Sequence, residues 1–510
     1  MRLRYAPQGE PAYRLCAIDD LERSSMSDSN TLRIAIIGAG PAGIATGREL
    51  IQKGFNEFTI FDALDAPGGT WRLHTYPGLA CDVWAHSYTF SYAPNPDWTA
   101  SFVDQPEIQA YLARCASEFG LDPHITLNTR IASAHYQEGG TWLVQTSTGE
   151  SHEFDVVINA MGNQHTPLFP NVEGMDSFQG DSFHGTRWNH DVDLAGKKVV
   201  LVGSAASAVQ IVPEVAKIAG HLTVLQRSAN WIMPRGKKPY SPRQRELARR
   251  FPAIISLTRW WQRLLMGQVE HAVTIGHKRM GQFEDMVRKF IGRTISDPKM
   301  QEELVPDTHY GCQRGLVSDD FYPALTRDNV ELVASGLQQV TPTGVVTADG
   351  HSIDADVIIY CTGYRIMDFD RIDVVGANGK VLAEVMADDP RAHKGIAVPD
   401  FPNYFFAVGP NGLVLNVSYF ITAEKNVETI VRLLDQMREA GHHTLGVKQD
   451  VFDEYNSWMN ERFARFSWGS SDCHSYYRNA AGHAPFLFPG NFKEYRRLHE
   501  ASGLAEYDVS

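Results

Sequence analysis

A glycine-rich loop between an apolar run and a helical run is the feature that most limits how this chain can fold. Residues 32–37 are mostly apolar and suit a buried parallel strand. They lead into a loop whose glycines allow a tight turn, close approach of backbone N–H groups to a pyrophosphate and close helix packing, at Gly38, Gly40 and Gly43. A second strand candidate, residues 57–61, ends in Asp62, whose carboxylate can hold a ribose hydroxyl. This order of segments predicts a dinucleotide-binding unit.

A second loop of the same kind follows the apolar run at residues 197–202. Its middle glycine is replaced by Ala205, whose methyl group leaves less room beside a pyrophosphate. The next strand candidate, residues 222–225, is followed by Arg227 and no acid; a guanidinium can bind a 2′-phosphate that a carboxylate would repel. An ordinary surface arginine is the alternative interpretation. We expect this loop to bind NADP rather than NAD, through Gly203, Ser204, Ser207 and Arg227.

The composition is that of an ordinary globular protein of several domains, with 510 residues, 43% hydrophobic and 21% charged side chains. A formal net charge of −13 argues against a nucleic-acid or anionic-membrane partner, and no apolar run is long enough to span a bilayer. The six cysteines lack paired or metal-type spacing, so we expect reduced thiols in a cytoplasmic protein, and no metal site. Residues 1–30 are polar and irregular, and we expect a disordered leader there.

Aromatic residues and glycines gather after the first nucleotide-binding unit. Glycines at this point let the backbone lie against a flat ring, and large aromatic side chains can pack at the edge of that ring. A Gly/Pro-rich surface loop is the alternative, but it does not readily explain so many aromatic residues beside one acid. In chain order the segment contains Gly69, Thr70, Trp71, Tyr76, Asp82 and Tyr88.

A further motif lies between the two glycine loops. Phe178, Gly180, His184 and Trp188 follow the spacing Phe-x-Gly-x-x-x-His-x-x-x-Trp, and Asn189 comes next. Its position predicts a linker that senses one cofactor and positions it against the other. A histidine beside aromatic residues is more often a hydrogen-bonded structural residue, and that alternative stays open for His184.

Together these motifs resemble those of the Baeyer–Villiger monooxygenases, which are class B flavoprotein monooxygenases. The similarity rests on Gly-Gly-Thr-Trp, Tyr-Pro-Gly, Cys-Asp and the Phe-to-Trp motif, and extends over about residues 32–498. It implies that the protein is an enzyme with FAD on the first unit and NADPH on the second, and that a ketone and O2 are the substrates. It further implies a C4a-peroxyflavin that attacks the ketone, which then rearranges to an ester or lactone.

The resemblance also implies roles for individual residues. Arg314 would supply positive charge beside the reacting oxygen atoms, Asp82 would orient it, and His184 would act at a hinge; an ordinary surface arginine is the alternative for Arg314. Gln313 stands where the family often has a lysine that helps to hold NADP. The cofactor-binding set for FAD would be Gly38, Gly40, Gly43, Asp62, Gly69, Thr70, Trp71, Tyr76, Asp82 and Tyr88, and Trp188 would also contact cofactor.

We expect an α/β fold of two Rossmann-like, doubly wound dinucleotide-binding domains, with a helical insert in the second. The FAD-binding domain would comprise residues 31–165 and 365–510, and the NADP-binding domain residues 166–235 and 311–364. The insert, residues 236–310, has an apolar stripe that we expect to be core, formed by Trp260, Trp261, Leu264, Leu265, Val269 and Ile275.

Two other activities compete with this interpretation. A flavin-containing oxygenase of sulfur or nitrogen would share both cofactors, although Trp188 and the Arg314 segment favour the Baeyer–Villiger reaction. An NADPH-dependent flavin reductase or oxidase is the second alternative. A disulfide reductase would need two cysteines close in sequence, and the chain has no such pair.

Overall fold

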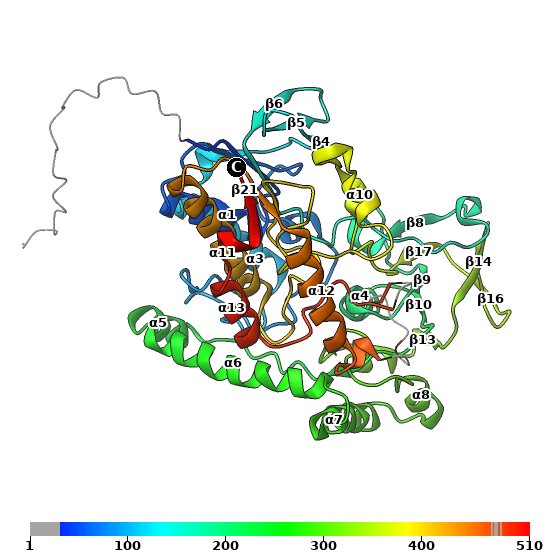
Figure 1. Cartoon of the computed structure of the whole chain (residues 1–510). Coiled ribbons are helices and arrows are strands. Elements are labelled where there is room, and N and C mark those ends of the chain that lie inside the picture. Colours follow the sequence, from blue (N-terminus) through cyan, green and yellow to red (C-terminus); the bar gives the residue numbers. More distant parts are fainter. Residues whose placement is uncertain (1–30, 471–472, 474–477, 480–481) are drawn as a thin grey trace, which may run out of the picture. The chain divides into compact units, whose positions relative to one another are not determined.

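Two parallel five-stranded sheets form the frame of this protein (Figure 1). The structure is a computed structural model and describes residues 31–470, 473, 478–479 and 482–510. The leader expected at residues 1–30 lies outside the described residues. Both sheets belong to one compact unit, Leu32–Ser510.

The first sheet has the strand order β19-β7-β1-β2-β3, and all of its neighbouring strands are parallel. Ile34 and Ile36 of β1 face the main core, whereas Ala35 and Ile37 pack in a second cluster with Trp142. Because both faces are buried, β1 is apolar at every position and does not alternate. The strands are β1 (Ile34–Ile37), β2 (Phe58–Phe61), β3 (Ile125–Thr126), β7 (Val156–Asn159) and β19 (Tyr404–Phe406).

The second sheet repeats this plan with the order β13-β10-β9-β17-β8, again all parallel. Val199 and Leu201 face the main core, and Val200 and Val202 pack in a smaller cluster on the other face. The predicted α/β class with two doubly wound units is confirmed. The strands are β8 (Asp181–His184), β9 (Lys198–Val202), β10 (His221–Leu225), β13 (Val330–Val333) and β17 (Val357–Tyr360).

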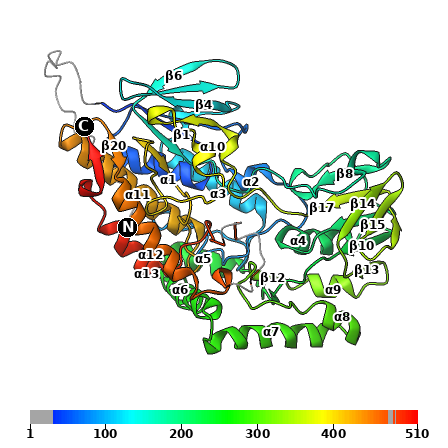
Figure 2. The same cartoon turned by 45° about the vertical axis from the view of Figure 1, so that its right-hand side comes forward.

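Each parallel sheet is covered on one face by a small, mainly antiparallel sheet (Figure 2). The first is covered by β4 (Ile131–Tyr136), β5 (Trp142–Thr146), β6 (Ser151–Phe154) and β18 (Asp373–Val375). The second is covered by β14 (Leu337–Thr341), β15 (Gly344–Thr347) and β16 (Ser352–Asp354).

Helices cover the opposite faces, and two of them, α1 and α4, begin directly after the glycine loops. Pro41, which lacks an N–H and suits a first helical turn, opens α1 directly after the first loop. Helix α11 packs along α1. The helices of this layer and of the carboxyl-terminal part are α1 (Pro41–Gln52), α2 (Thr70–Leu73), α3 (Gln105–Glu118), α4 (Ala206–Val215), α9 (Phe321–Leu325), α10 (Leu382–Val385), α11 (Tyr419–Glu439), α12 (Gln449–Phe463) and α13 (Phe492–Glu500).

The motif at residues 178–190 is not wholly a connecting segment. Its residues 181–184 form β8, an edge strand that pairs in parallel with β17 from Val357↔Asp181 to Tyr360↔His184. The prediction of a linker was therefore wrong for these four residues of the motif. The polar sequence of residues 181–184 did not indicate a strand. The strand forms because it pairs with β17, which lies more than a hundred residues away in the chain.

The insert is helical, as predicted, but its apolar stripe is not core. It contains α5 (Pro242–Arg250), α6 (Ala253–Val273), α7 (Lys278–Thr294) and α8 (Pro298–Glu303), between the paired strands β11 (Ile232–Met233) and β12 (Leu316–Val317). The buried residues of α6 are instead Ile255, Gln262, Ala272 and Val273. Most of the stripe is 43–56% exposed, at Trp260, Trp261, Leu264, Leu265 and Ile275.

The expectation that all cysteines are reduced thiols was also wrong. Cys312 and Cys473 form a disulfide across a sequence separation of 161 residues, with their Cα atoms 5.4 Å apart. Spacing in the sequence cannot reveal such a pair, since only the tertiary fold brings it together. Cys81, Cys115 and Cys361 are buried free thiols.

The chain passes between the two parallel sheets at two points that lie side by side. Leu168 N donates to Gly363 O at 2.9 Å, and Arg365 N donates to Thr166 O at 3.0 Å. The two crossing segments therefore run antiparallel and support each other. In the part of the chain that the structure describes, none of the helices is both long and apolar enough to cross a membrane.

Candidate active site

A cavity of about 1810 Å³ opens beside the carboxyl ends of strands in both parallel sheets. It is lined by the loop after β1 and by the loop after β9, the two segments that the sequence predicts to bind dinucleotides. Its volume exceeds the roughly 300–1,000 Å³ of a pocket for one small ligand. The cavity therefore has room for more than one bound molecule, in the place where open α/β sheets bind ligands.

The three glycines of the first loop serve two different purposes. A Cβ at Gly43 would lie 1.8 Å from Gly38 O, and one at Gly38, whose φ is +111°, would lie 2.6 Å from Ala160 O. Those two positions require glycine for the fold itself. Gly40 has an ordinary φ of −75°, and a Cβ there would meet only Gly69, at 3.5 Å from its Cα and 3.9 Å from its N. Glycine at position 40 therefore lets the backbone at Gly69 lie against the loop, and the N–H groups at the start of α1 form a cradle that suits a pyrophosphate.

Asp62 holds this loop in place at the end of β2. Its Oδ2 accepts from Ala39 N at 2.6 Å and its Oδ1 from Leu64 N at 2.8 Å. Burial raises the pKa of the Asp62 carboxyl, while the two backbone N–H groups act in the opposite direction. A carboxylate has about four lone-pair sites, so Asp62 can fix the loop and still accept from a ribose hydroxyl.

The aromatic residues of the flavin-side motif are joined to one another. Trp71 Nε1 donates to Tyr88 Oη at 3.1 Å, and both residues line the cavity with Gly69 and Thr70. Gly69 has a φ of +56°, a conformation that favours glycine. These groups form one fixed wall of the cavity.

The segment after this wall bridges to the second glycine loop. Tyr76 Oη donates to Gln210 Oε1 at 3.2 Å, and Gln210 Nε2 donates to Ala80 O at 2.9 Å. A Cβ at Gly78 would lie only 2.3 Å from Gln210 O. The segment thus packs directly against α4, and this contact brings Asp82 to the middle of the cavity.

The second loop is shaped like the first. Gly203 has a φ of +114°, and a Cβ there would lie 2.5 Å from Cys361 O. Ser204 Oγ donates to Ser228 O at 3.0 Å, and Ser207 interacts with the hydroxyl groups of Tyr76 and Tyr364. Arg227 is exposed at the cavity rim, so its guanidinium is accessible to a ligand.

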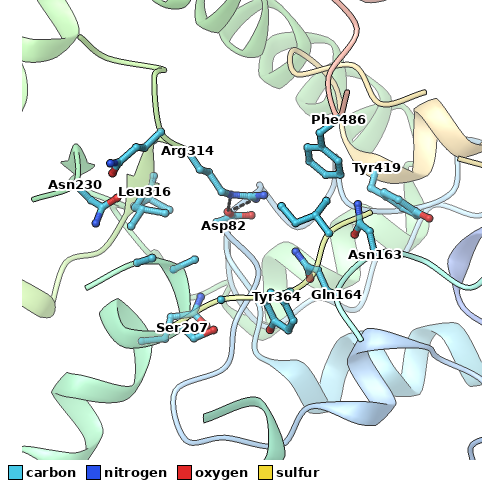
Figure 3. Close-up of a pocket in the computed structure, with 18 of the residues that line it drawn as sticks. Asp82, Asn163, Gln164, Ser207, Asn230, Arg314, Leu316, Tyr364, Tyr419 and Phe486 are labelled. Atoms are coloured by element: carbon cyan, nitrogen blue, oxygen red, sulfur yellow. Dashed lines mark hydrogen bonds and ion pairs between the residues drawn. The ribbon is translucent and has the colours of Figure 1, made fainter. Parts of the chain in front are cut away.

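Arg314 and Asp82 meet at the centre of the cavity although they lie 232 residues apart (Figure 3). Arg314 Nε donates to Asp82 Oδ2 at 3.0 Å, and Nη2 donates to the same oxygen. Their side chains are 38% and 27% exposed. The carboxylate therefore fixes the direction of a guanidinium that faces an open, partly apolar chamber.

The structure adds cavity residues that the sequence did not single out as site residues (Figure 3). Tyr364 stacks on buried His74, with ring centroids 5.6 Å apart, and burial lowers the pKa of His74 to about 3. Asn163, Gln164 and Tyr364 adjoin the two chain crossings, a signal that could have identified them. Tyr419, the first residue of α11, and Phe486 carried no such signal, because long-range folding alone brings them here.

His184, Trp188 and Gly43 are not among the described residues that line the cavity. His184 Nδ1 accepts from Thr186 N at 3.2 Å and so caps the short turn after β8. Burial, followed by the nearby Arg187 guanidinium, lowers the pKa of His184 to about 4, so its imidazole is neutral. This geometry fits a structural role, and its action at a hinge stays a prediction. Among the described residues no cluster of His, Cys, Asp and Glu could hold a metal ion.

Comparison with protein families agrees with this arrangement. A family model described as flavin-binding monooxygenase-like matches residues 31–375. The chain belongs to the flavin-binding monooxygenase-like family. Within this family it is similar to a Baeyer–Villiger monooxygenase of Streptomyces coelicolor, with 37% identity over 484 residues that cover 94% of this chain and 92% of the relative. A second Baeyer–Villiger monooxygenase, from Pseudomonas aeruginosa, is 34% identical over 94% of this chain and 91% of the relative.

Solved structures give the same result. The structure of OTEMO in complex with FAD and NADP covers 94% of this chain and 100% of its own, with a TM-score of 0.85 and 26% identity. Cyclohexanone monooxygenase from Rhodococcus sp. Phi1 bound to NADP+ covers 94% of this chain and 99% of its own, with a TM-score of 0.83 and 25% identity. The predicted resemblance to Baeyer–Villiger monooxygenases is therefore confirmed.

Proposed function

We propose that this protein is an NADPH- and FAD-dependent monooxygenase that inserts one oxygen atom of O2 beside a ketone carbonyl, giving an ester or a lactone. The observation that carries the proposal is the Arg314 guanidinium, which Asp82 directs into a cavity lined by two dinucleotide-binding loops. The reaction balances as ketone, O2, NADPH and a proton giving ester, NADP+ and water. The oxygen-transferring intermediate expected from the family resemblance stays a prediction.

The residues of the first loop fit FAD. The cradle at the start of α1, next to Gly40, would hold the pyrophosphate, Asp62 would accept from a ribose hydroxyl, and the wall formed by Thr70, Trp71 and Tyr88 would border the ring system. We assign residues 31–165 and 365–510 to this FAD-binding part.

The residues of the second loop fit NADPH. The turn at Gly203 and the start of α4 would face its pyrophosphate, and Arg227 would bind its 2′-phosphate. The methyl group of Ala205 would leave less room for the pyrophosphate than the glycine of the first loop does. Gln313, which lines the cavity, offers an uncharged amide and so adds no second positive charge beside Arg227. We assign residues 166–235 and 311–364 to this part, with the helical insert at 236–310.

When bound, the two cofactors would supply the two electrons that the reduction of O2 requires. The chain's own residues provide the environment for the oxygen transfer. Arg314 would stabilise negative charge that develops on the reacting oxygen atoms, and Asp82 would hold the guanidinium in that orientation. Apolar side chains such as Phe486 and Leu316 line the same cavity and would limit the access of water.

Replacement of Arg314 tests the proposal directly. We expect Arg314→Ala to lose ester formation by about a hundredfold or more while FAD stays bound, because a charge-stabilising donor is commonly worth 10²–10³ in rate. Arg314→Lys, which keeps the charge and loses the paired hydrogen bonds, should retain a fraction of that activity. The measurement is product analysis with a ketone and a sulfide in one assay, alongside the flavin absorbance of the purified protein. Full ester formation by Arg314→Ala would refute the role of Arg314, and oxidation of the sulfide alone by the unmodified enzyme would favour an S-oxygenase.

A further inference from the structure

Helix α6 presents a large apolar surface to solvent. Its exposed residues follow the i, i+3, i+4, i+7 spacing of one helical face, and we refer to this set as the α6 face. Trp260 and Trp261, whose ring centroids lie 5.3 Å apart, form its middle. Monomeric proteins seldom expose large contiguous apolar patches unless something binds there. The α6 face consists of Ile254, Leu257, Trp260, Trp261, Leu264 and Leu265, which are 43–59% exposed.

The segment that carries the α6 face is basic although the protein is acidic, even though Lys237 pairs with Asp104 and Arg249 with Asp97. Residues 237–263 contain eight Lys and Arg side chains and one acidic residue, Glu246, whereas the whole chain has a formal net charge of −13. Arg250 lies next to the ring of Phe251, with its Cζ 5.7 Å from the ring centroid, and Arg263 is exposed on α6. The composition of the whole chain argues against an anionic partner, but this segment has the opposite charge.

The other side of α6 belongs to the cavity wall. Met266, Val269 and Val273 line the cavity, and Leu265 contributes to both the cavity and the α6 face. Figure 1 shows α5 and α6 along one edge of the protein. The exposed apolar surface is therefore continuous with the wall of the active-site cavity.

We propose that α5 and α6 dock on an anionic lipid surface, with the α6 face in the acyl-headgroup boundary and the surrounding arginines on the headgroups. An amphipathic helix with Trp and Leu on one side and Arg near them has the composition of an interfacial helix, and basic side chains close to an anionic surface add to its binding. Two copies of this chain would instead bring two basic segments together, and their repulsion disfavours a dimer through the same face. The docking is peripheral and requires no assumption about the reaction.

Vesicle co-sedimentation of the full-length holoenzyme tests this proposal. The probes are vesicles of phosphatidylcholine alone and vesicles in which about one third is phosphatidylglycerol. We expect the protein to pellet with the anionic vesicles, to bind the neutral vesicles far more weakly, and to be released as salt is raised, because exposed charges are screened over roughly 10 Å at 0.1 M salt.

Paired variants separate the apolar contribution from the charged one. The double substitution Trp260→Ser and Trp261→Ser should weaken binding by about tenfold or more, because both rings would lose their burial in the interface. Arg250→Gln with Arg263→Gln should weaken binding by about fivefold per arginine. Ile218→Ser, at a residue that is 52% exposed outside the insert, is the matched control and should bind as the unmodified protein does. None of these side chains lines the cavity, so flavin content and melting temperature should stay unchanged in all of them.

Three results would overturn the proposal. The first is a failure of the unmodified protein to bind the anionic vesicles. The second is vesicle binding that the two tryptophan substitutions leave unaltered. The third is a dimer in sedimentation velocity that these substitutions dissolve, since a second copy would then be what covers the α6 face.

Discussion

We expect Arg227 to decide which reductant the second loop prefers. It follows β10, where a carboxylate would select NAD, and the structure leaves its side chain exposed at the cavity rim. If the guanidinium binds the 2′-phosphate, Arg227→Ala should raise KM for NADPH by about ten- to a hundredfold, because this is the loss in affinity expected when hydrogen bonds to a charged group are removed. The KM for NADH, which lacks this phosphate, should stay nearly unchanged. Steady-state kinetics with both nucleotides measure this. Equal increases for NADPH and NADH would show that Arg227 does not recognise the phosphate.

Glu424 on α11 connects a single, partly buried carboxyl to the pH dependence of stability. Its Oε1 accepts from Ser91 N at 2.6 Å, and burial raises its pKa from 4.5 to about 7. The folded protein therefore favours the protonated form. The stability that this group contributes is fully present below its unfolded pKa and is lost as the pH rises through about 7.

We therefore expect Glu424→Gln to flatten the decline of the melting temperature between about pH 4.5 and pH 7. The shift corresponds to about 3 kcal/mol as an upper figure, at 1.36 kcal/mol per pKa unit. Thermal unfolding across this range is the measurement. Glu439→Gln, on the exposed end of the same helix, is the control and should keep the unmodified slope. If Glu424→Gln and the unmodified protein show parallel slopes, this carboxyl is not the cause.

The first glycine loop shows how one element combines requirements of the fold with requirements of a ligand. Gly43→Ala would place a methyl group 1.8 Å from Gly38 O and should prevent the packing of α1 on β1. Gly40→Ala meets nothing closer than 3.5 Å and keeps a permitted backbone. The added methyl group would still stand at the edge of the cradle, against Gly69.

For Gly40→Ala we therefore expect a folded protein that binds FAD at least about tenfold more weakly, since the backbone can no longer approach the pyrophosphate. The ratio of flavin to protein absorbance and the melting temperature of the flavin-free form measure the two effects separately. Full flavin occupancy in this variant would show that the cradle is not a pyrophosphate site.

Helix α6 illustrates what an apolar pattern can and cannot reveal. The helical period of its stripe was recognised correctly, and the helix exists. The sequence pattern does not show which face of the helix packs against the rest of the protein, because the buried residues Ile255, Ala272 and Val273 are also apolar, like the exposed tryptophans. Only contacts with other elements distinguish the two faces.

The disulfide between Cys312 and Cys473 ties distant parts of the whole molecule together. It joins the segment that carries Arg314 to the carboxyl-terminal part of the chain, across 161 residues. A disulfide is typically worth about 2–4 kcal/mol of stability, mainly through the unfolded chain.

Thiol labelling tests this bond. Without a reductant, the denatured protein should label at four of its six cysteines, and at all six after reduction. Cys312→Ser should label at all five of its remaining cysteines without reduction and should melt at a lower temperature. Six labelled thiols in the unreduced protein would mean that the two cysteines remain reduced.

The sequence by itself determined the two parallel units and the placement of both glycine loops, because an apolar strand, a glycine turn and a helix start are encoded within about fifteen consecutive residues. It also pointed to Asp82 and Arg314 through motifs that resemble those of a known family. The tertiary structure decided which of these residues meet: it joined Asp82 to Arg314, kept His184 out of the cavity lining, paired Cys312 with Cys473, and turned the α6 face to solvent. Each of these outcomes depends on packing between segments that lie far apart in the chain, and no local pattern records such packing.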